Sequence, residues 1–296
     1  MKIINFFKKI YPLAIIILFH IINTFIWLKI DRSYLKLDAW GHYRYSLEVY
    51  DFLKGFVHFQ FPLSAIEPIR RHGVLVGLVT APFYFIFGSA QDTAVMINCS
   101  IFLPILVFSV YGIGKKLLNR QAGLLAVFIL TSYPIIFNNL RIYMLDLPLT
   151  SMVALGLYFL IASDNFSDRK NSLLFGLSLG LGLLTKFNYI AFIIGPLFFV
   201  LYRTFKQKSV LSKRKIKNIV YLAAIAFFLC LAFYLVKYNE ILQRIYELSN
   251  ICIFKNHRFA FSGFLSQVLF STLKYLEMLI KEGISFLFLI ALWSHY

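Results

Sequence analysis

Charge is scarce in this 296-residue chain: only 15% of its residues are charged, and only 13 of them are acidic. Hydrophobic residues make up 60% of the chain, and the mean hydropathy is +0.75. A soluble domain of this size does not carry so much apolar surface with so few charges. The composition therefore excludes a soluble enzyme and predicts a polytopic membrane protein.

Cysteine is also rare, with three residues in the whole chain. Cys99 and Cys230 lie inside apolar runs, so the spacing gives neither a disulfide framework nor a zinc site. No small-residue cleavage site follows the first apolar run, which extends from residue 10 to 30 after a basic N-terminus. This run is therefore interpreted as a retained first span rather than as a signal peptide.

The net charge of +17 could by itself suggest nucleic-acid binding. In a membrane protein, basic cytoplasmic loops and contacts with anionic lipid or phosphate explain such a charge better. We therefore expect no nucleic-acid partner. No internal repeat, low-complexity linker or soluble domain is visible, so residues 1–296 are interpreted as a single transmembrane domain.

Apolar runs predict most of the spans directly. Candidate spans are residues 10–30, 94–113, 122–138, 148–163, 172–185, 188–205 and 219–237, with an eighth starting near 284. Another apolar run, residues 74–87, has only fourteen residues and contains Pro82. Such a run is too short to cross a bilayer and is more typical of a re-entrant or surface-lying helix.

The distribution of Lys and Arg supports this non-crossing interpretation of residues 74–87. If residues 74–87 do not cross, 15 cations and only two acids fall in four cytoplasmic segments: 1–9, 114–121, 164–171 and 203–218. If residues 74–87 crossed, the strongest basic clusters would lie outside, against the positive-inside rule. The predicted outer segments are 31–93, 139–147, the turn at Lys186 and 238–283.

The first outer loop carries an acid at the start of a predicted surface helix. From Asp38, apolar side chains recur at three- and four-residue steps (Trp40, Tyr43, Leu47, Tyr50 and Leu53), which indicates an amphipathic helix. Asp38 can be a helix N-cap, or a general base or metal ligand at the membrane edge. His42, four residues later, would share its face.

Two further groups of ionisable residues fall in the predicted outer segments. Glu67, Arg70, Arg71 and His72 directly precede the run 74–87; the arginines can bind phosphate or simply snorkel to the headgroup level. Between two apolar runs, Arg141 and Asp146 occupy a short loop, and Lys186 lies on the same predicted face. Lys186 could neutralise Asp146, either as a structural ion pair or as part of a site.

Outer acids, outer arginines and a groove in the membrane suit a lipid-linked phosphosugar. Its tail stays in the bilayer while its phosphate lies at the surface. An acid would deprotonate the incoming hydroxyl, and cations or a metal would stabilise the departing phosphate.

Four elements resemble a known family, the GT-C membrane glycosyltransferases of the protein-O-mannosyltransferase and aminoarabinose-transferase type, which use a phospholipid carrier. They are Asp38 in the first outer loop, Glu67-Pro68 before a short helix ending at Phe87-Gly88, a block from Ala122 through Pro134 to Leu149, and Gly180 to Lys186. The third block, with Arg141, Met144, Leu145, Asp146 and Pro148, is the most specific of the four.

The resemblance implies an all-α GT-C helix bundle with surface-lying helices in the first outer loop. It also implies Asp38 as the catalytic acid and a polyprenyl-phosphate sugar donor used on the extracytoplasmic face of the cell membrane. Many members have Asp-Glu where this chain has Asp38-Ala39. A divalent metal (Mg, Mn or Zn) held through Glu67 is left open as a cofactor.

These lines combine into one prediction: sugar transfer from a polyprenyl phosphate to an external lipid, glycan or protein acceptor. Asp38 and Asp146 are the predicted catalytic residues; the predicted substrate-binding residues are His42, Arg70, Arg71, Arg141, Lys186 and Arg258. Two alternatives stay open. One is a lipid or glycan transporter, although the spans hold almost no ionisable groups. The other is an inactive fragment, since the chain ends at Tyr296 inside a predicted span.

Overall fold

The computed structural model of this chain is built from α-helices, and none of the residues it describes forms a β-strand. The described residues are 2–31, 33, 35, 37–57, 73–206 and 213–236. The elements are α1 (Lys2–Ile30), α2 (Leu37–Val57), α3 (Val74–Phe87), α4 (Gln91–Ile97), a π-helix η2 (Asn98–Phe102), α5 (Leu103–Leu117), α6 (Arg120–Ser132), α7 (Pro134–Asn139), α8 (Asp146–Ala162), α9 (Arg169–Thr185), α10 (Tyr189–Lys206) and α11 (Lys213–Val236).

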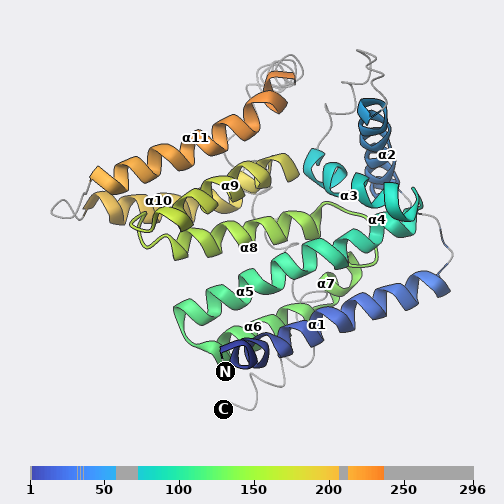
Figure 1. Cartoon of the computed structure of the whole chain (residues 1–296), viewed down its shortest axis with the longest axis horizontal. Helices are drawn as coiled ribbons and strands as arrows, with labels where there is room; N and C mark the ends of the chain where they lie inside the picture. Colours follow the sequence, from blue (N-terminus) through green and yellow to red (C-terminus); the bar gives the residue numbers. More distant parts are fainter. Residues whose placement is uncertain are drawn as a thin grey trace, which may run out of the picture.

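The long helices form a bundle that one helix crosses at its end. Helices α1, α5, α6, α8, α9, α10 and α11 run roughly alongside one another, whereas α2 lies across the right-hand end of the bundle in this view (Figure 1). Helix α3 packs against α2, and the α7–α8 loop lies at this same end. Helices α2 and α3 thus pack together at this end, and their position at the membrane surface stays a prediction.

Apolar side chains cover the outside of the bundle as well as its interior. On α1, Ile15, Leu18, Phe19, Ile22 and Phe25 are each about half exposed, and α10 and α11 carry similar exposed Phe side chains. Within the described part of the chain, three segments are long and apolar enough to cross a bilayer: Tyr11–Ile30, Gln91–Leu117 and Tyr189–Lys206. The fold is therefore that of an all-α polytopic membrane protein, as predicted.

Small residues let neighbouring helices approach closely, as is typical of membrane helix packing. A Cβ atom at Gly114 would lie 2.7 Å from the Cα of Gly123, which fixes α5 against α6. Between α9 and α11, a Cβ at Gly176 would lie 2.7 Å from the Cα of Leu222. These contacts explain why the glycine-rich run of α9 forms a helix despite the low helix propensity of glycine.

Two predicted elements differ from what the structure contains. The run 122–138 is divided into α6 and α7, because Tyr133 is extended (φ −65°, ψ 130°) immediately before Pro134. On α2, Trp40 lies outside the buried face, with 47% of its surface exposed. Instead, Tyr43, Tyr45, Ser46 and Val49 form the buried face. The predicted eighth span and the outer segment 238–283 lie outside the described residues.

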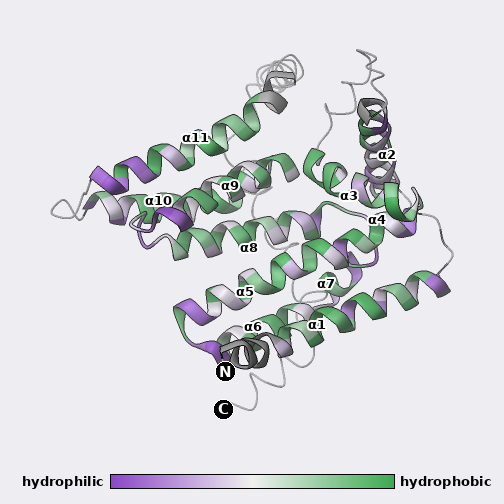
Figure 2. Ribbon diagram, viewed as in Figure 1, coloured by the Kyte–Doolittle hydropathy of each residue, from purple (hydrophilic) through white to green (hydrophobic). Residues whose placement is uncertain are grey.

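The basic segments gather at the end of the bundle opposite α2. Hydrophilic residues mark the α5–α6 turn, the α8–α9 turn and the start of α11 at the left of Figure 2. Two contacts join the α8–α9 turn and the start of α9 to α11: Asn218 Nδ2 donates to the carbonyl oxygen of Phe166 at 2.9 Å, and the Arg169 guanidinium lies 5.5 Å from the Tyr221 ring. We refer to this as the basic end and to the other as the α2 end.

Candidate functional site at the α2 end

The centre of the candidate site is an ion pair between the start of α8 and the residue that follows α9. Nζ of Lys186 lies 3.1 Å from Oδ1 of Asp146 and donates a hydrogen bond to it. Asp146 is the first residue of α8, and Lys186 directly follows α9. The predicted contact between these two residues is thus confirmed, and both side chains keep a third to a half of their surface exposed.

Helix α2 brings His42 to this ion pair. Burial lowers the pKa of His42 below its ordinary value of 6.5. The carboxylates of Asp38 and Asp146 act in the opposite direction and raise it, whereas the Lys186 ammonium lowers it further. All three charges are therefore close enough to act on the imidazole, which is neutral at pH 7.

Asp38 lies in the first turn of α2, one turn before His42, and it is exposed. Because α2 begins at Leu37, Asp38 is not the N-cap that the sequence suggested as an alternative, but in the first turn its carboxylate interacts favourably with the helix dipole. Among the described residues, none forms a hydrogen bond or an ion pair with its carboxylate, and its role as a base remains a prediction. Four of the predicted site residues, Asp38, His42, Asp146 and Lys186, nevertheless come from three separate segments and meet at the α2 end.

Buried hydroxyl pairs hold these segments in place. The Tyr143 and Thr80 hydroxyls lie 2.8 Å apart and join the α7–α8 loop to α3. The Ser46 and Tyr84 hydroxyls lie 2.7 Å apart and join α2 to α3. Burial raises the pKa of Tyr143 to about 12, so its hydroxyl stays protonated at physiological pH. The pairs fix α2 relative to the loop that carries Asp146.

A glycine and an asparagine add two further constraints on this loop. Gly73 adopts a left-handed conformation (φ +86°), and a Cβ atom there would overlap the side chain of Leu145. In η2, Asn98 Nδ2 donates to the carbonyl oxygens of Asn139 (3.2 Å) and Ile142 (2.8 Å). Both contacts connect residues far apart in the sequence, and the sequence analysis did not identify either of them.

Arg141 takes part in a different set of contacts. Its guanidinium lies between two rings, 4.3 Å from Trp27 and 4.2 Å from Phe137, and donates to Asn23 Oδ1 at 2.6 Å. These partners belong to α1 and α7, so Arg141 is held beside the first span rather than by Asp146. Its substrate-binding role stays a prediction.

The remaining predicted residues, Glu67, Arg70, Arg71 and Arg258, lie outside the described residues. Within the described part of the chain, no group of three or more His, Cys, Asp or Glu side chains has the geometry of a metal site. Asp146 is moreover paired with a cation, which disfavours a metal there. The described residues therefore do not fit a metal, and we derive no step through one.

The arrangement can deprotonate a hydroxyl and stabilise an anion within one site. Asp38 presents an exposed carboxylate, the neutral His42 imidazole can donate or accept a hydrogen bond, and Lys186 presents an ammonium group. This combination suits transfer to a hydroxyl with an anionic leaving group. It requires no group that would protonate the leaving group.

Comparison with known proteins gives an independent line of evidence. Residues 71–234, more than half of the chain, match the dolichyl-phosphate-mannose-protein mannosyltransferase family. The matched region includes Arg141, Asp146 and Lys186, whereas Asp38 and His42 precede it. No curated protein and no solved structure matches significantly. The chain is a glycosyltransferase of the GT-C type and belongs to the dolichyl-phosphate-mannose-protein mannosyltransferase family.

Proposed function

We propose that this chain transfers a sugar from a polyprenyl-phosphate donor to an acceptor hydroxyl at the α2 end of the bundle. The observation that carries the proposal is the meeting of Asp38, His42 and the Asp146–Lys186 pair at one end of an apolar helix bundle. The description of the family, which names a dolichyl-phosphate-linked mannose, supports a lipid-phosphate donor.

In the proposed reaction Asp38 takes the proton of the acceptor hydroxyl. The hydroxyl oxygen forms a bond to the anomeric carbon, and the bond between that carbon and the phosphate oxygen breaks. The polyprenyl phosphate leaves with the bonding electron pair, so atoms and charges balance without a further reactant. Lys186 would stabilise the negative charge on this phosphate, and Asp146 would hold the ammonium in position.

We assign neutral His42 a positioning role, as a hydrogen-bond partner of donor or acceptor beside Asp38. Arg70, Arg71 and Arg258 are proposed as further phosphate contacts. Arg141, which lies next to α1, is proposed to bind substrate at the edge of the site. Glu67 is kept as the proposed metal ligand, without a step assigned to the metal.

The proposed activity can be tested with the purified full chain in lipid nanodiscs. Polyprenyl-phosphate mannose labelled in the sugar is supplied together with lipid, glycan or peptide acceptors, and labelled product is separated from donor. Acceptor-dependent transfer is expected from the lipid-phosphate donor and not from a nucleotide-linked sugar. Transfer from the nucleotide sugar alone would contradict the proposed donor class.

The proposed orientation puts the α2 end outside the cell membrane and the basic end in the cytoplasm, with a multi-pass arrangement of the bundle. The excess of cations at the basic end supports it. In a cysteine-free background, Lys54→Cys on α2 and Lys170→Cys on α9 remove one cation each from exposed positions at opposite ends. An impermeant thiol reagent applied to cells should label position 54 only. Labelling of position 170 alone would show that the basic end, and not the α2 end, faces the outside.

A further inference from the structure

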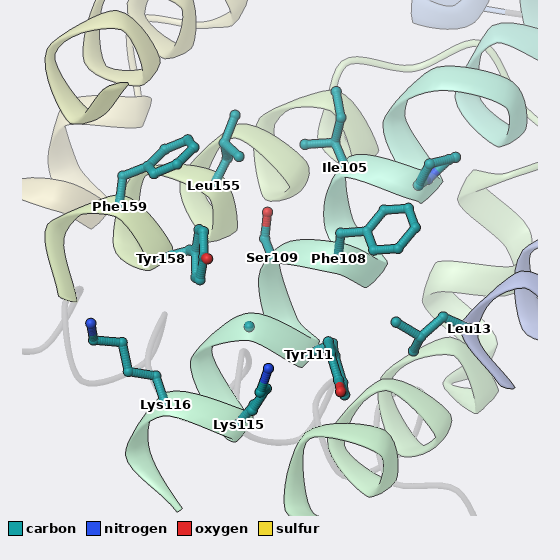
Figure 3. Close-up of a pocket in the computed structure, with 12 residues that line it drawn as sticks. Leu13, Ile105, Phe108, Ser109, Tyr111, Lys115, Lys116, Leu155, Tyr158 and Phe159 are labelled. Atoms are coloured by element: carbon teal, nitrogen blue, oxygen red, sulfur yellow. The ribbon is translucent and has the colours of Figure 1, made fainter. Parts of the chain in front are cut away.

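A groove opens between α1, α5 and α8 toward the basic end, away from the candidate site. Its volume is about 740 Å³. Leu13, Phe108, Leu155 and Phe159 form apolar walls, and two lysines, Lys115 and Lys116, stand at one end (Figure 3). The groove is thus apolar along most of its length and cationic at its end in the last turn of α5.

One polar side chain inside the groove has an unsatisfied hydroxyl. Ser109 is 2% exposed, and its Oγ has no hydrogen-bond partner among the described residues. A serine in a membrane helix commonly bonds to the carbonyl four residues earlier, and here it does not. Its hydroxyl lies beneath the wall of the groove, between Phe108 and Tyr158 (Figure 3). A buried hydroxyl without a partner is unfavourable, so this position suits a ligand with an acceptor oxygen.

The cations at the end of the groove favour an anionic ligand. Lys115 and Lys116 are exposed and follow each other in sequence. Hydrogen bonds from Asn171 and, to a lesser degree, the nearby Lys116 ammonium lower the pKa of the Asp168 carboxyl. That carboxylate already accepts hydrogen bonds from the backbone nitrogen of Asn171 at 3.2 Å and from its side chain at 2.9 Å. The end of the groove therefore keeps an excess of positive charge.

We propose that this groove binds one anionic phospholipid from the leaflet at the basic end. Its phosphate would lie at Lys115 and Lys116, its acyl ester carbonyl would accept a hydrogen bond from Ser109, and an acyl chain would lie along Phe108, Leu155 and Phe159. Ser109 and Lys116 are two helical turns apart, roughly 10 Å along the axis of α5. This separation matches a molecule with an anionic headgroup, then acceptor oxygens, then an apolar chain.

A phospholipid fits the groove better than the proposed polyprenyl-phosphate donor does. A donor with its phosphate at the basic end could not present its sugar to Asp38, which lies at the opposite end of the bundle. A polyprenyl chain also lacks ester carbonyls, so it would leave the Ser109 hydroxyl unpaired. The lipid site is consequently separate from the site of transfer.

The test uses the full chain after removal of bound lipid, with phosphatidylglycerol and phosphatidylcholine of identical acyl chains as probes. Lipid binding is measured by native mass spectrometry, and a photoreactive acyl chain identifies the contact residues. We expect wild type to prefer phosphatidylglycerol and to crosslink at Phe108, Leu155 or Phe159. Lys115→Gln combined with Lys116→Gln should weaken phosphatidylglycerol binding roughly ten- to thirty-fold, with little effect on phosphatidylcholine.

Two variants separate this site from general effects. Arg203→Gln combined with Lys206→Gln removes the same charge near the end of α10, outside the groove, and should leave the preference intact. Ser109→Ala should weaken both lipids similarly, because the ester group is common to them. Equal loss of preference in both double variants would overturn the proposal.

Three other results would also overturn it: displacement of phosphatidylglycerol by an equimolar polyprenyl phosphate, crosslinks outside the groove, or crosslinks between α5 and residues 237–296 in place of lipid. The first would assign the groove to the donor. The last would assign it to a segment of the same chain.

Discussion

Lys186 and Asp146 lie forty residues apart in the sequence, yet their Nζ and Oδ1 atoms are 3.1 Å apart at the α2 end. Both side chains remain partly exposed, with 34% and 50% of their surfaces accessible. A pair this exposed contributes little to stability, on the order of 1 kcal/mol or less. It can, however, keep an ammonium group oriented toward an incoming phosphate. A structural role and a substrate-binding role of this pair lead to different predictions.

Replacing Lys186 with Met should reduce use of the donor far more than it reduces stability. Loss of one charge-assisted phosphate contact corresponds to roughly a ten- to hundred-fold lower rate at limiting donor. The rate is measured against donor concentration at fixed acceptor, alongside thermal unfolding. Lys54→Met, which removes an exposed cation from α2, should change neither. If Lys186→Met lowers the unfolding temperature strongly and leaves the donor dependence unchanged, the pair is structural.

The protonation of His42 should respond to its charged neighbours in opposite directions. Because Asp38 raises and Lys186 lowers its pKa, Asp38→Asn should shift the pKa of His42 down and Lys186→Met should shift it up. The pKa is measured by NMR on the full chain labelled at histidine, with His42→Gln identifying the signal. A shift of the same sign in both variants would contradict the described cluster.

Because the pKa of His42 is lowered in the folded chain, the stability of the protein should depend on pH. Between pH 6.5 and the lower folded value, the unfolded chain binds more protons than the folded chain. The contribution of His42 to the free energy of unfolding is therefore fully present above pH 6.5, and it is lost as the pH falls through the pKa of His42 in the folded chain.

Removing the Asn98 side chain should loosen the loop that carries Asp146. Asn98→Ala deprives the carbonyls of Asn139 and Ile142 of their donor, at a cost of about 1–3 kcal/mol. Hydrogen exchange in residues 139–146 should be roughly tenfold faster or more. Asn98→Leu is similar in size but cannot donate and should behave similarly, while Asn171→Ala at the basic end should leave the loop unchanged. Unaltered exchange in both Asn98 variants would show that the loop is held by other contacts.

Because Tyr189 packs closely against Gly182, replacing this glycine with alanine should destabilise the protein much more than the same change at Gly195. A methyl group at Gly182 would overlap the Tyr189 ring, whereas one at Gly195 would meet nothing within 4 Å. Gly182→Ala should lower the free energy of unfolding by about 1–3 kcal/mol, and Gly195→Ala should change it by about 0.5 kcal/mol or less. The measurement is unfolding in mixed detergent micelles. Equal effects would rule out this packing of α9 against Tyr189.

The sequence was sufficient to predict much of the helical framework. Helix α3 begins at Val74 and ends at Phe87, the residues of the predicted short run, because the glycines at positions 73 and 88 both have positive φ. Uninterrupted apolar runs similarly predicted α9 and α10 to within three residues. The division of α6 from α7 was missed, although Pro134 is the local signal that marks it.

The arrangement of the site could be predicted only in part. The opposite charges of Asp146 and Lys186, at the ends of two adjacent apolar runs, indicated their contact in advance. The contacts of Tyr143 with Thr80 and of Asn98 with Ile142 join neutral side chains and backbone groups across 63 and 44 residues. Neither charge nor periodicity marks such pairs. Arg141 has a charge like that of Lys186, but its aromatic partners depend on how α1 packs.

The most direct test of the proposed reaction is the rate of sugar transfer by Asp38→Asn. The amide has nearly the same size as the carboxylate and lies at an exposed position, so the variant should fold, but it cannot accept the acceptor proton. Asp51→Asn, an exposed acid later on the same helix, is the matched control. With polyprenyl-phosphate mannose as donor, Asp38→Asn should transfer about 10²- to 10⁴-fold more slowly than wild type, and Asp51→Asn at the wild-type rate. Transfer by Asp38→Asn at near the wild-type rate would contradict the assignment of Asp38 as the base and leave it only its interaction with the dipole of α2.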